Sequence, residues 1–97
     1  MKSSEKELAD KLISHVEGFY YEISVLSKSK PDNPLNLFKL KFINEKLAEA
    51  NVILTGEYKP LKDFTVFDET SLPTNSDVVM VLSQYRARLK AWSWDHR

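Results

Sequence analysis

Apolar residues near the end of the chain recur at every third or fourth position, which is the spacing of one face of an α-helix. The series consists of Val78, Leu82, Tyr85, Leu89 and Trp92. At about 100° per residue these side chains fall within an arc of about 80°, so they form a narrow seam that faces a core. Thr74 followed by Asp77 has the form of a capping box, although Ser76 is an equally good N-cap. The pattern predicts a helix over residues 76–95.

The same period runs through the first part of the chain. Its apolar members are Leu8, Leu12, Val16, Phe19, Ile23 and Leu26. Ser4 and Glu7 precede them with the spacing of a capping box, and the two prolines of residues 30–34 follow them. We therefore expect a helix over residues 4–28.

A second helix is expected over residues 34–55. Asn33 is a favourable N-cap residue, and Pro34 would occupy the first helical position, where a missing N–H group costs nothing. Gly56 is a plausible residue to follow the end of this helix. Its main apolar stripe consists of Leu40, Ile43, Leu47, Ala50 and Leu54.

Composition supports the helical interpretation. The 97 residues include 2 glycines and 4 prolines, too few for the closely spaced turns of a small β-sandwich or barrel. A hydrophobic content of 42% with 29% charged residues is typical of an ordered globular protein. The sequence therefore predicts one all-α domain over residues 1–97, built as a three-helix bundle.

The stretch between the second and third helices, residues 57–75, has no helical period but is rich in apolar side chains. Structureless connections of this length are uncommon in compact domains, and so apolar a segment argues against disorder. We expect an ordered connection that packs aromatic side chains onto the bundle, with a short strand or turn near residues 64–67. The alternative is a binding loop that presents an acidic tip, Asp68 and Glu69.

The predicted third helix carries a second stripe, about 180° from the seam. It consists of Met80, Ser83, Ala87, Ala91 and Trp94, and is called the outer stripe below. Alanine is the best helix former, and the connection could also fold over this face. The third interpretation is a partner or dimer interface, because tryptophan and methionine are enriched there and small residues allow close approach. Two copies would then cross near Ala87.

Basic residues flank the outer stripe. The basic patch consists of Arg86, Arg88, Lys90 and Arg97, while residues 63–77 carry four acidic side chains. Complementarity to the helix dipole accounts for this arrangement, and guidance of a docking partner is the sharper alternative. Nucleic-acid binding, with Trp94 as a stacking surface, is a further hypothesis. The balance of 14 basic and 14 acidic residues argues against it.

No motif indicates a catalytic, metal or cofactor site. The two histidines, His15 and His96, lack a partner at metal-ligand spacing, and there is no cysteine, Gly-rich phosphate loop or G-x-S-x-G sequence. Arg88 and His96 are the nearest approach to a nuclease pair, but they lie about 80° apart on a helix.

The function that these observations favour is that of a small non-enzymatic helical protein acting through protein–protein contacts. A homodimer is the first expectation, and an accessory, adaptor, inhibitor or immunity-type role would fit. A nucleic-acid-binding accessory protein is the alternative, and a small-ligand-binding or nuclease-type domain is less favoured. The charged N-terminus and the absence of a long apolar run predict a cytoplasmic protein without a membrane partner.

Overall fold

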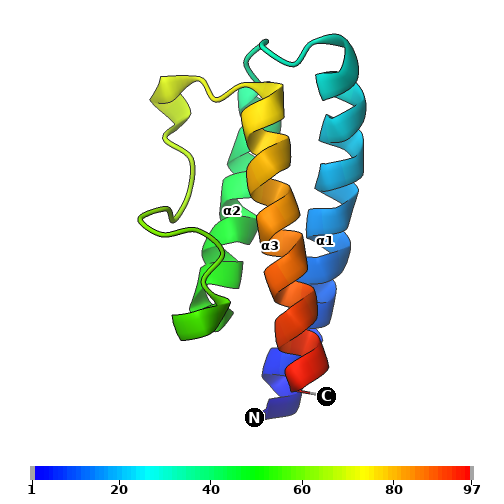
Figure 1. Cartoon of the computed structure of the whole chain (residues 1–97), viewed down its shortest axis with the longest axis vertical. Helices are drawn as coiled ribbons and strands as arrows, with labels where there is room; N and C mark the ends of the chain where they lie inside the picture. The colour runs from blue at the N-terminus through cyan, green and yellow to red at the C-terminus, as the bar shows by residue number, and fades with distance from the viewer. Residues whose placement is uncertain (1, 97) are drawn as a thin grey trace.

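The computed structural model describes residues 2–96, which form three packed helices (Figure 1). These are α1 (Lys2–Ser29), α2 (Leu37–Ile53) and α3 (Asn75–Asp95). Two short 3₁₀ helices, η1 (Gly56–Tyr58) and η2 (Glu69–Ser71), lie in the connection between α2 and α3. α1 lies along much of α3 and also packs against α2. The all-α three-helix prediction is confirmed.

One hydrophobic core fills the space between the three helices. All five residues of the predicted α3 seam are buried. The core is completed mainly by Leu12, Val16 and Ile23 of α1 and by Leu40, Ile43 and Leu47 of α2. Burying each such aliphatic side chain stabilises the fold by about 1.5–3 kcal/mol, so the core is the main source of stability.

The expected N-caps of the first two helices are wrong. α1 begins at Lys2, so Ser4 lies inside the helix and cannot be its N-cap. α2 begins at Leu37 instead of residue 34, and the side chain of Asn36 is its N-cap, accepting from the Lys39 backbone N–H at 3.2 Å. The reason is tertiary: Pro34 forms an isolated β-bridge with Thr74, and the Leu35 N–H donates to the Pro73 carbonyl at 3.0 Å, so this segment is bonded to the start of α3 before α2 begins.

The start of α3 is as predicted. The Thr74 side chain accepts from the Asp77 N–H at 3.2 Å, and the Asp77 carboxylate accepts from the Thr74 N–H at 3.4 Å. The buried Asn75 next to this cap donates through Nδ2 to the Lys30 carbonyl at 2.9 Å. These bonds join the end of α1 to the beginning of α3 at one end of the bundle.

The connection between α2 and α3 is ordered and lies on the side of α2 remote from α1 (Figure 1). Its side chains Tyr58, Leu61, Phe64 and Phe67 pack against the core, as expected. The segment near residues 64–67 contains bends and no strand. Within the predicted acidic tip, Asp68 is the N-cap of η2 and accepts from the Thr70 hydroxyl and N–H, which lower the pKa of its carboxyl.

Candidate interaction surface

The outer stripe of α3 faces away from the core. Trp94 is 64% exposed and Met80 is 53% exposed. Ala87 is exposed as well, whereas Ser83 and Ala91 are half-buried. The alternative in which the connection folds over this face is wrong, because the connection packs beside α2 instead.

The middle of the outer stripe presents little polar surface. The Ser83 hydroxyl donates to the Met80 carbonyl at 2.7 Å, so its hydrogen-bonding capacity is directed back into the helix. Ala87 and Ala91 add only methyl groups. The backbone of α3 is therefore thinly covered along this line, with the exposed side chains of Gln84 and Arg88 beside it.

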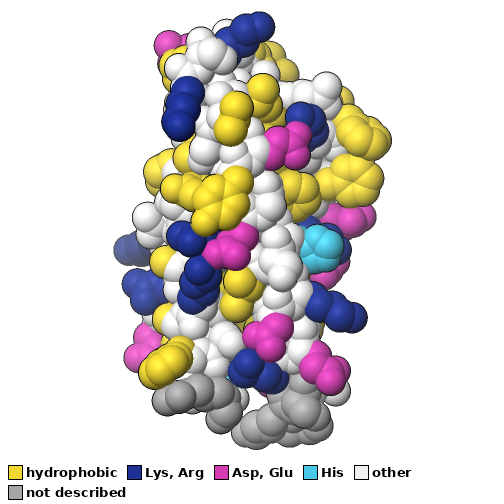
Figure 2. All heavy atoms as spheres, turned by 90° about the vertical axis from the view of Figure 1, so that its right-hand side faces the viewer, with side chains coloured by type: hydrophobic (Ala, Val, Ile, Leu, Met, Phe, Trp, Pro, Cys, Tyr) yellow, Lys and Arg dark blue, Asp and Glu magenta, His cyan; other side chains and the backbone are white. Residues whose placement is uncertain are grey.

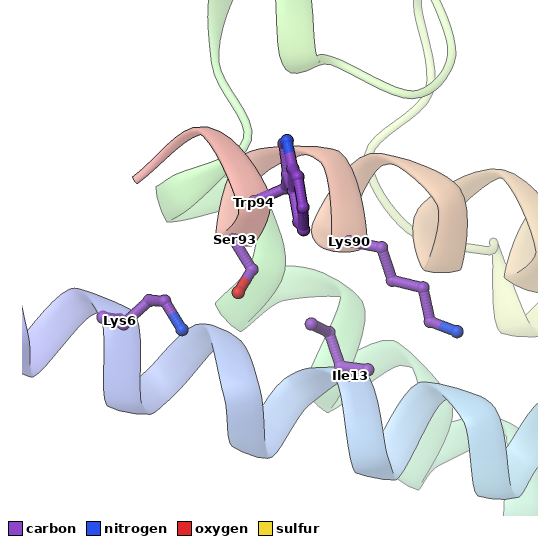
Figure 3. Close-up of a pocket in the computed structure, with 5 residues that line it drawn as sticks. All are labelled: Lys6, Ile13, Lys90, Ser93 and Trp94. Atoms are coloured by element: carbon purple, nitrogen blue, oxygen red, sulfur yellow. The ribbon is translucent and has the colours of Figure 1, made fainter. Parts of the chain in front are cut away.

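A shallow hollow of about 330 Å³ lies beside Trp94, between α1 and α3 (Figure 3). It is lined by Lys6 and Ile13 from α1 and by Lys90, Ser93 and Trp94 from α3. Figure 3 shows Ser93 pointing from α3 toward α1, with Ile13 projecting from α1 toward α3. The sequence did not predict this hollow, because its lining residues are distant in the chain and share no motif.

Glu17 of α1 neutralises part of the predicted basic patch. Its carboxylate lies 2.6 Å from Lys90 Nζ and 2.9 Å from Arg86 Nε. The hydrogen bonds from Lys90 and then Arg86 lower the pKa of Glu17. Arg88 is exposed, and Arg97 lies outside the described residues. Because two of its four cations are engaged with Glu17, the patch offers less positive charge to an anionic polymer than the sequence suggested.

Two further apolar side chains of α1 are exposed. Tyr21 and Val25 are 57% and 66% exposed. The Arg86 guanidinium lies 5.5 Å from the centre of the Tyr20 ring and 5.9 Å from that of Tyr21. Figure 2, which views the molecule from the α1 side, shows hydrophobic side chains interspersed with lysine, arginine and acidic side chains. Non-obligate interfaces and ordinary protein surface share such a mixture, so this face by itself does not identify a contact.

The polar groups at the end of α3 have structural roles. Tyr58 donates to Asp95 at 2.6 Å, and this bond raises the pKa of Tyr58 to about 12, so the phenol is protonated at neutral pH. The His96 ring stacks on Trp92 at 4.0 Å between centroids, and its Nδ1 lies 2.8 Å from the Trp92 carbonyl. These contacts fit the role of His96 as the C-cap of α3.

The described residues carry neither a metal-binding cluster nor a membrane-spanning helix. Residues 2–96 contain no group of three or more His, Cys, Asp or Glu side chains placed to hold a metal ion. No helix within the same residues is both long and apolar enough to cross a membrane. Neither finding assigns a function.

The Glu17 ion pairs predict a pH dependence of stability. The pKa of Glu17 is held below its ordinary value of 4.5 in the folded chain. The contribution of the pairs is therefore present above about pH 4.5 and is lost as the pH falls through the lowered pKa. Urea unfolding between pH 7 and pH 3 should show a weaker dependence for Glu17→Gln than for the wild type.

The exposed Glu45 of α2 supplies the matched control, because Glu45→Gln removes a carboxylate outside this cluster. Its pH dependence should follow that of the wild type. Some pH dependence of stability should persist in Glu17→Gln, because the pKa of Asp10 is lowered as well. The hydrogen bond from Lys6 lowers it more than the hydrogen bond from Ser93 does. Identical pH profiles for Glu17→Gln and the wild type would show that the ion pairs contribute nothing to stability.

The remaining evidence comes from comparison with known proteins. No protein-family model matches the sequence, and no curated protein or solved structure is significantly similar to it. The function must therefore be inferred from the surface itself, whose main features are an exposed tryptophan, a small-residue stripe and an adjacent hollow.

Proposed function

We propose that this chain is a small non-enzymatic helical protein that acts through protein–protein contact, with the outer stripe of α3 as the contact surface and a second copy as its partner. The observation that carries the proposal is the 64% exposure of Trp94 at the end of this stripe. Tryptophan is among the residues most enriched at the energetic centres of interfaces.

Three features of the surface support close contact. The small side chains near Ala87 let a second helix approach α3, and Met80 and Trp94 supply large apolar side chains at either end. The hollow beside Trp94 has room for a partner's side chain. A two-fold interface uses the same surface on both copies, so the helices would cross near the middle of the stripe, at Ala87.

The expected association is weak. A standard interface buries about 800 Å² on each partner, and one face of a single helix provides less. We therefore expect a dissociation constant of about 10–100 µM, which corresponds to roughly −5.5 to −7 kcal/mol. Sedimentation velocity should show a concentration-dependent shift over this range.

Ala87→Glu should abolish self-association, because it places a charged side chain at the predicted crossing point. Ala48→Glu is the matched control: Ala48 is also an exposed helical alanine, but it belongs to α2. The expected affinity sets the protein concentrations for sedimentation velocity at about 10–300 µM. Over this range Ala87→Glu should remain monomeric, and Ala48→Glu should associate like the wild type.

Cross-linking provides an independent readout of the same contact, since the chain has no cysteine. A disulfide requires Cα atoms within about 7 Å, so Ala87→Cys should form a covalent dimer under mild oxidation. Ala48→Cys should form far less. A wild type that stays monomeric at all these concentrations, with equal cross-linking of both variants, would exclude self-association through the outer stripe.

A further inference from the structure

The side of α2 and α3 opposite the α1 contact is covered by four residues of the connection, residues 64–67, here called the strap. The Phe64 ring lies 5.2 Å from the Phe67 ring and 6.3 Å from that of Tyr85. Both pairs of rings meet in edge-to-face fashion, a geometry that favourable aromatic contacts adopt. The strap thus places two aromatic side chains, three residues apart, onto the bundle.

The bundle holds the strap by its backbone. Asn44 Nδ2 donates to the Phe67 carbonyl at 2.9 Å, while the Phe67 N–H donates to Asn44 Oδ1, also at 2.9 Å. Two turns later on α2, Asn51 Nδ2 donates to the Thr65 carbonyl at 2.8 Å. The Tyr85 hydroxyl donates to Asn51 Oδ1 at 2.6 Å, which fixes that amide. Asn44, Asn51 and Tyr85 are called the strap seat below.

Contacts of these two kinds are also those by which proteins bind peptides of other chains. Bonds to a peptide backbone supply affinity that does not depend on the side chains of the bound segment, while contacts with selected side chains supply specificity. Here the backbone partners are two asparagines, and the selected side chains are Phe64 and Phe67. None of these contacts requires the strap to be covalently joined to the helices that hold it.

Left-handed backbone on both sides of the strap favours its release. Asp63, directly before Phe64, has φ 61°, and Leu72, after η2, has φ 53°. This conformation costs a leucine roughly 1–2 kcal/mol and an aspartate less, because aspartate is among the residues that adopt it readily, and the cost is recovered when the segment becomes free. Thr65 and Val66 are also exposed, so the strap contributes only part of its side chains to the core.

We propose that the strap is a displaceable internal ligand. It opens separately from the helices, and the strap seat then binds a short bent segment of another protein that carries two aromatic side chains three residues apart. This site lies on a different side of α3 from the outer stripe, so it neither requires self-association nor depends on it.

Hydrogen exchange in the wild-type chain tests whether the strap opens by itself. The Phe67 amide, bonded to Asn44, should exchange at least about 100-fold faster than the amide of Leu89 in the middle of α3, after correction for intrinsic rates. Equal protection of the two amides would mean that the strap is released only by global unfolding, and this would overturn the proposal.

Binding of a synthetic peptide tests the seat. The probe is a fluorescent peptide of residues 60–69, and the control peptide has serine at both phenylalanine positions. A full-length variant with Phe64→Ser and Phe67→Ser should bind the probe at least about 10-fold more tightly than the wild type does, because the wild-type strap competes at a millimolar effective concentration. It should not bind the control peptide.

Three results would contradict the proposal. One is a folded double variant, with wild-type helical circular dichroism, that binds neither peptide up to about 1 mM, the effective concentration of the tethered strap. Another is equal binding of both peptides. The third is self-association that Ala87→Glu does not abolish and that the probe peptide disrupts. This result would assign the seat to the strap of a second copy. If the double variant does not fold, the hydrogen-exchange result alone decides.

Discussion

Replacing Tyr85 by alanine is expected to lower the free energy of unfolding by about 3–5 kcal/mol, a large part of the total for a domain of this size. The side chain is completely buried, and it contacts both the core and the strap. Its hydroxyl donates to Asn51 Oδ1 at 2.6 Å and lies 3.3 Å from the Thr65 carbonyl. Truncation therefore leaves a cavity and breaks the contact that links α3 to α2 and the strap.

Tyr85→Phe separates these two contributions. It keeps the ring and removes only the hydroxyl, so the half-buried oxygen of Asn51 loses its partner. We expect a loss of about 1–2 kcal/mol, clearly smaller than that of Tyr85→Ala. Urea unfolding followed by far-ultraviolet circular dichroism measures both values.

Val52 on α2 is a suitable control for these measurements, because its side chain is exposed. Val52→Ala should change the free energy of unfolding by less than about 0.5 kcal/mol. A loss of less than about 1.5 kcal/mol for Tyr85→Ala would show that the centre of the bundle collapses around the missing ring. It would also mean that Tyr85 is not the main link between α3 and the strap.

The parts of the fold that could be predicted from the sequence are those with a local cause. The seam of α3 is buried as expected, because a 3.6-residue period directly determines which side chains share a helix face. The Thr74 capping box was also recognisable, since both of its partners lie within one turn. By contrast, the N-terminus of α2 was misplaced, because Pro34 pairs with Thr74, 40 residues away in the sequence.

The remaining features depend on contacts between distant residues, for which the sequence contains no signal. Asn44 binds the backbone of Phe67, 23 residues away, and a backbone partner leaves no pattern of side chains to recognise. Glu17 meets Arg86 across 69 residues. The sequence therefore indicates the basic patch but not the Glu17 carboxylate that neutralises part of it. The outer stripe was visible as a helical period, but only the structure shows that the connection leaves it uncovered.

Trp92→Ala and Trp94→Ala should affect stability very differently, although the two residues are only two positions apart. Trp92 is 6% exposed and belongs to the core seam, and its ring supports that of His96 at the end of α3. We expect Trp92→Ala to cost about 3–5 kcal/mol in the free energy of unfolding. Trp94→Ala should cost less than about 1 kcal/mol, because most of this side chain is already in water.

For self-association the order is reversed, so that Trp94→Ala should have the larger effect and Trp92→Ala the smaller. Trp94→Ala removes the largest apolar side chain of the proposed contact, and loss of such an anchor typically costs 2 kcal/mol or more, about a 30-fold weaker dimer. Trp92→Ala leaves the outer stripe intact under all conditions in which the variant is folded. Urea unfolding and sedimentation velocity on the same two variants therefore measure independent properties. If Trp94→Ala associates as tightly as the wild type, the exposed tryptophan is not an anchor, and the outer stripe loses the observation that makes it a contact surface.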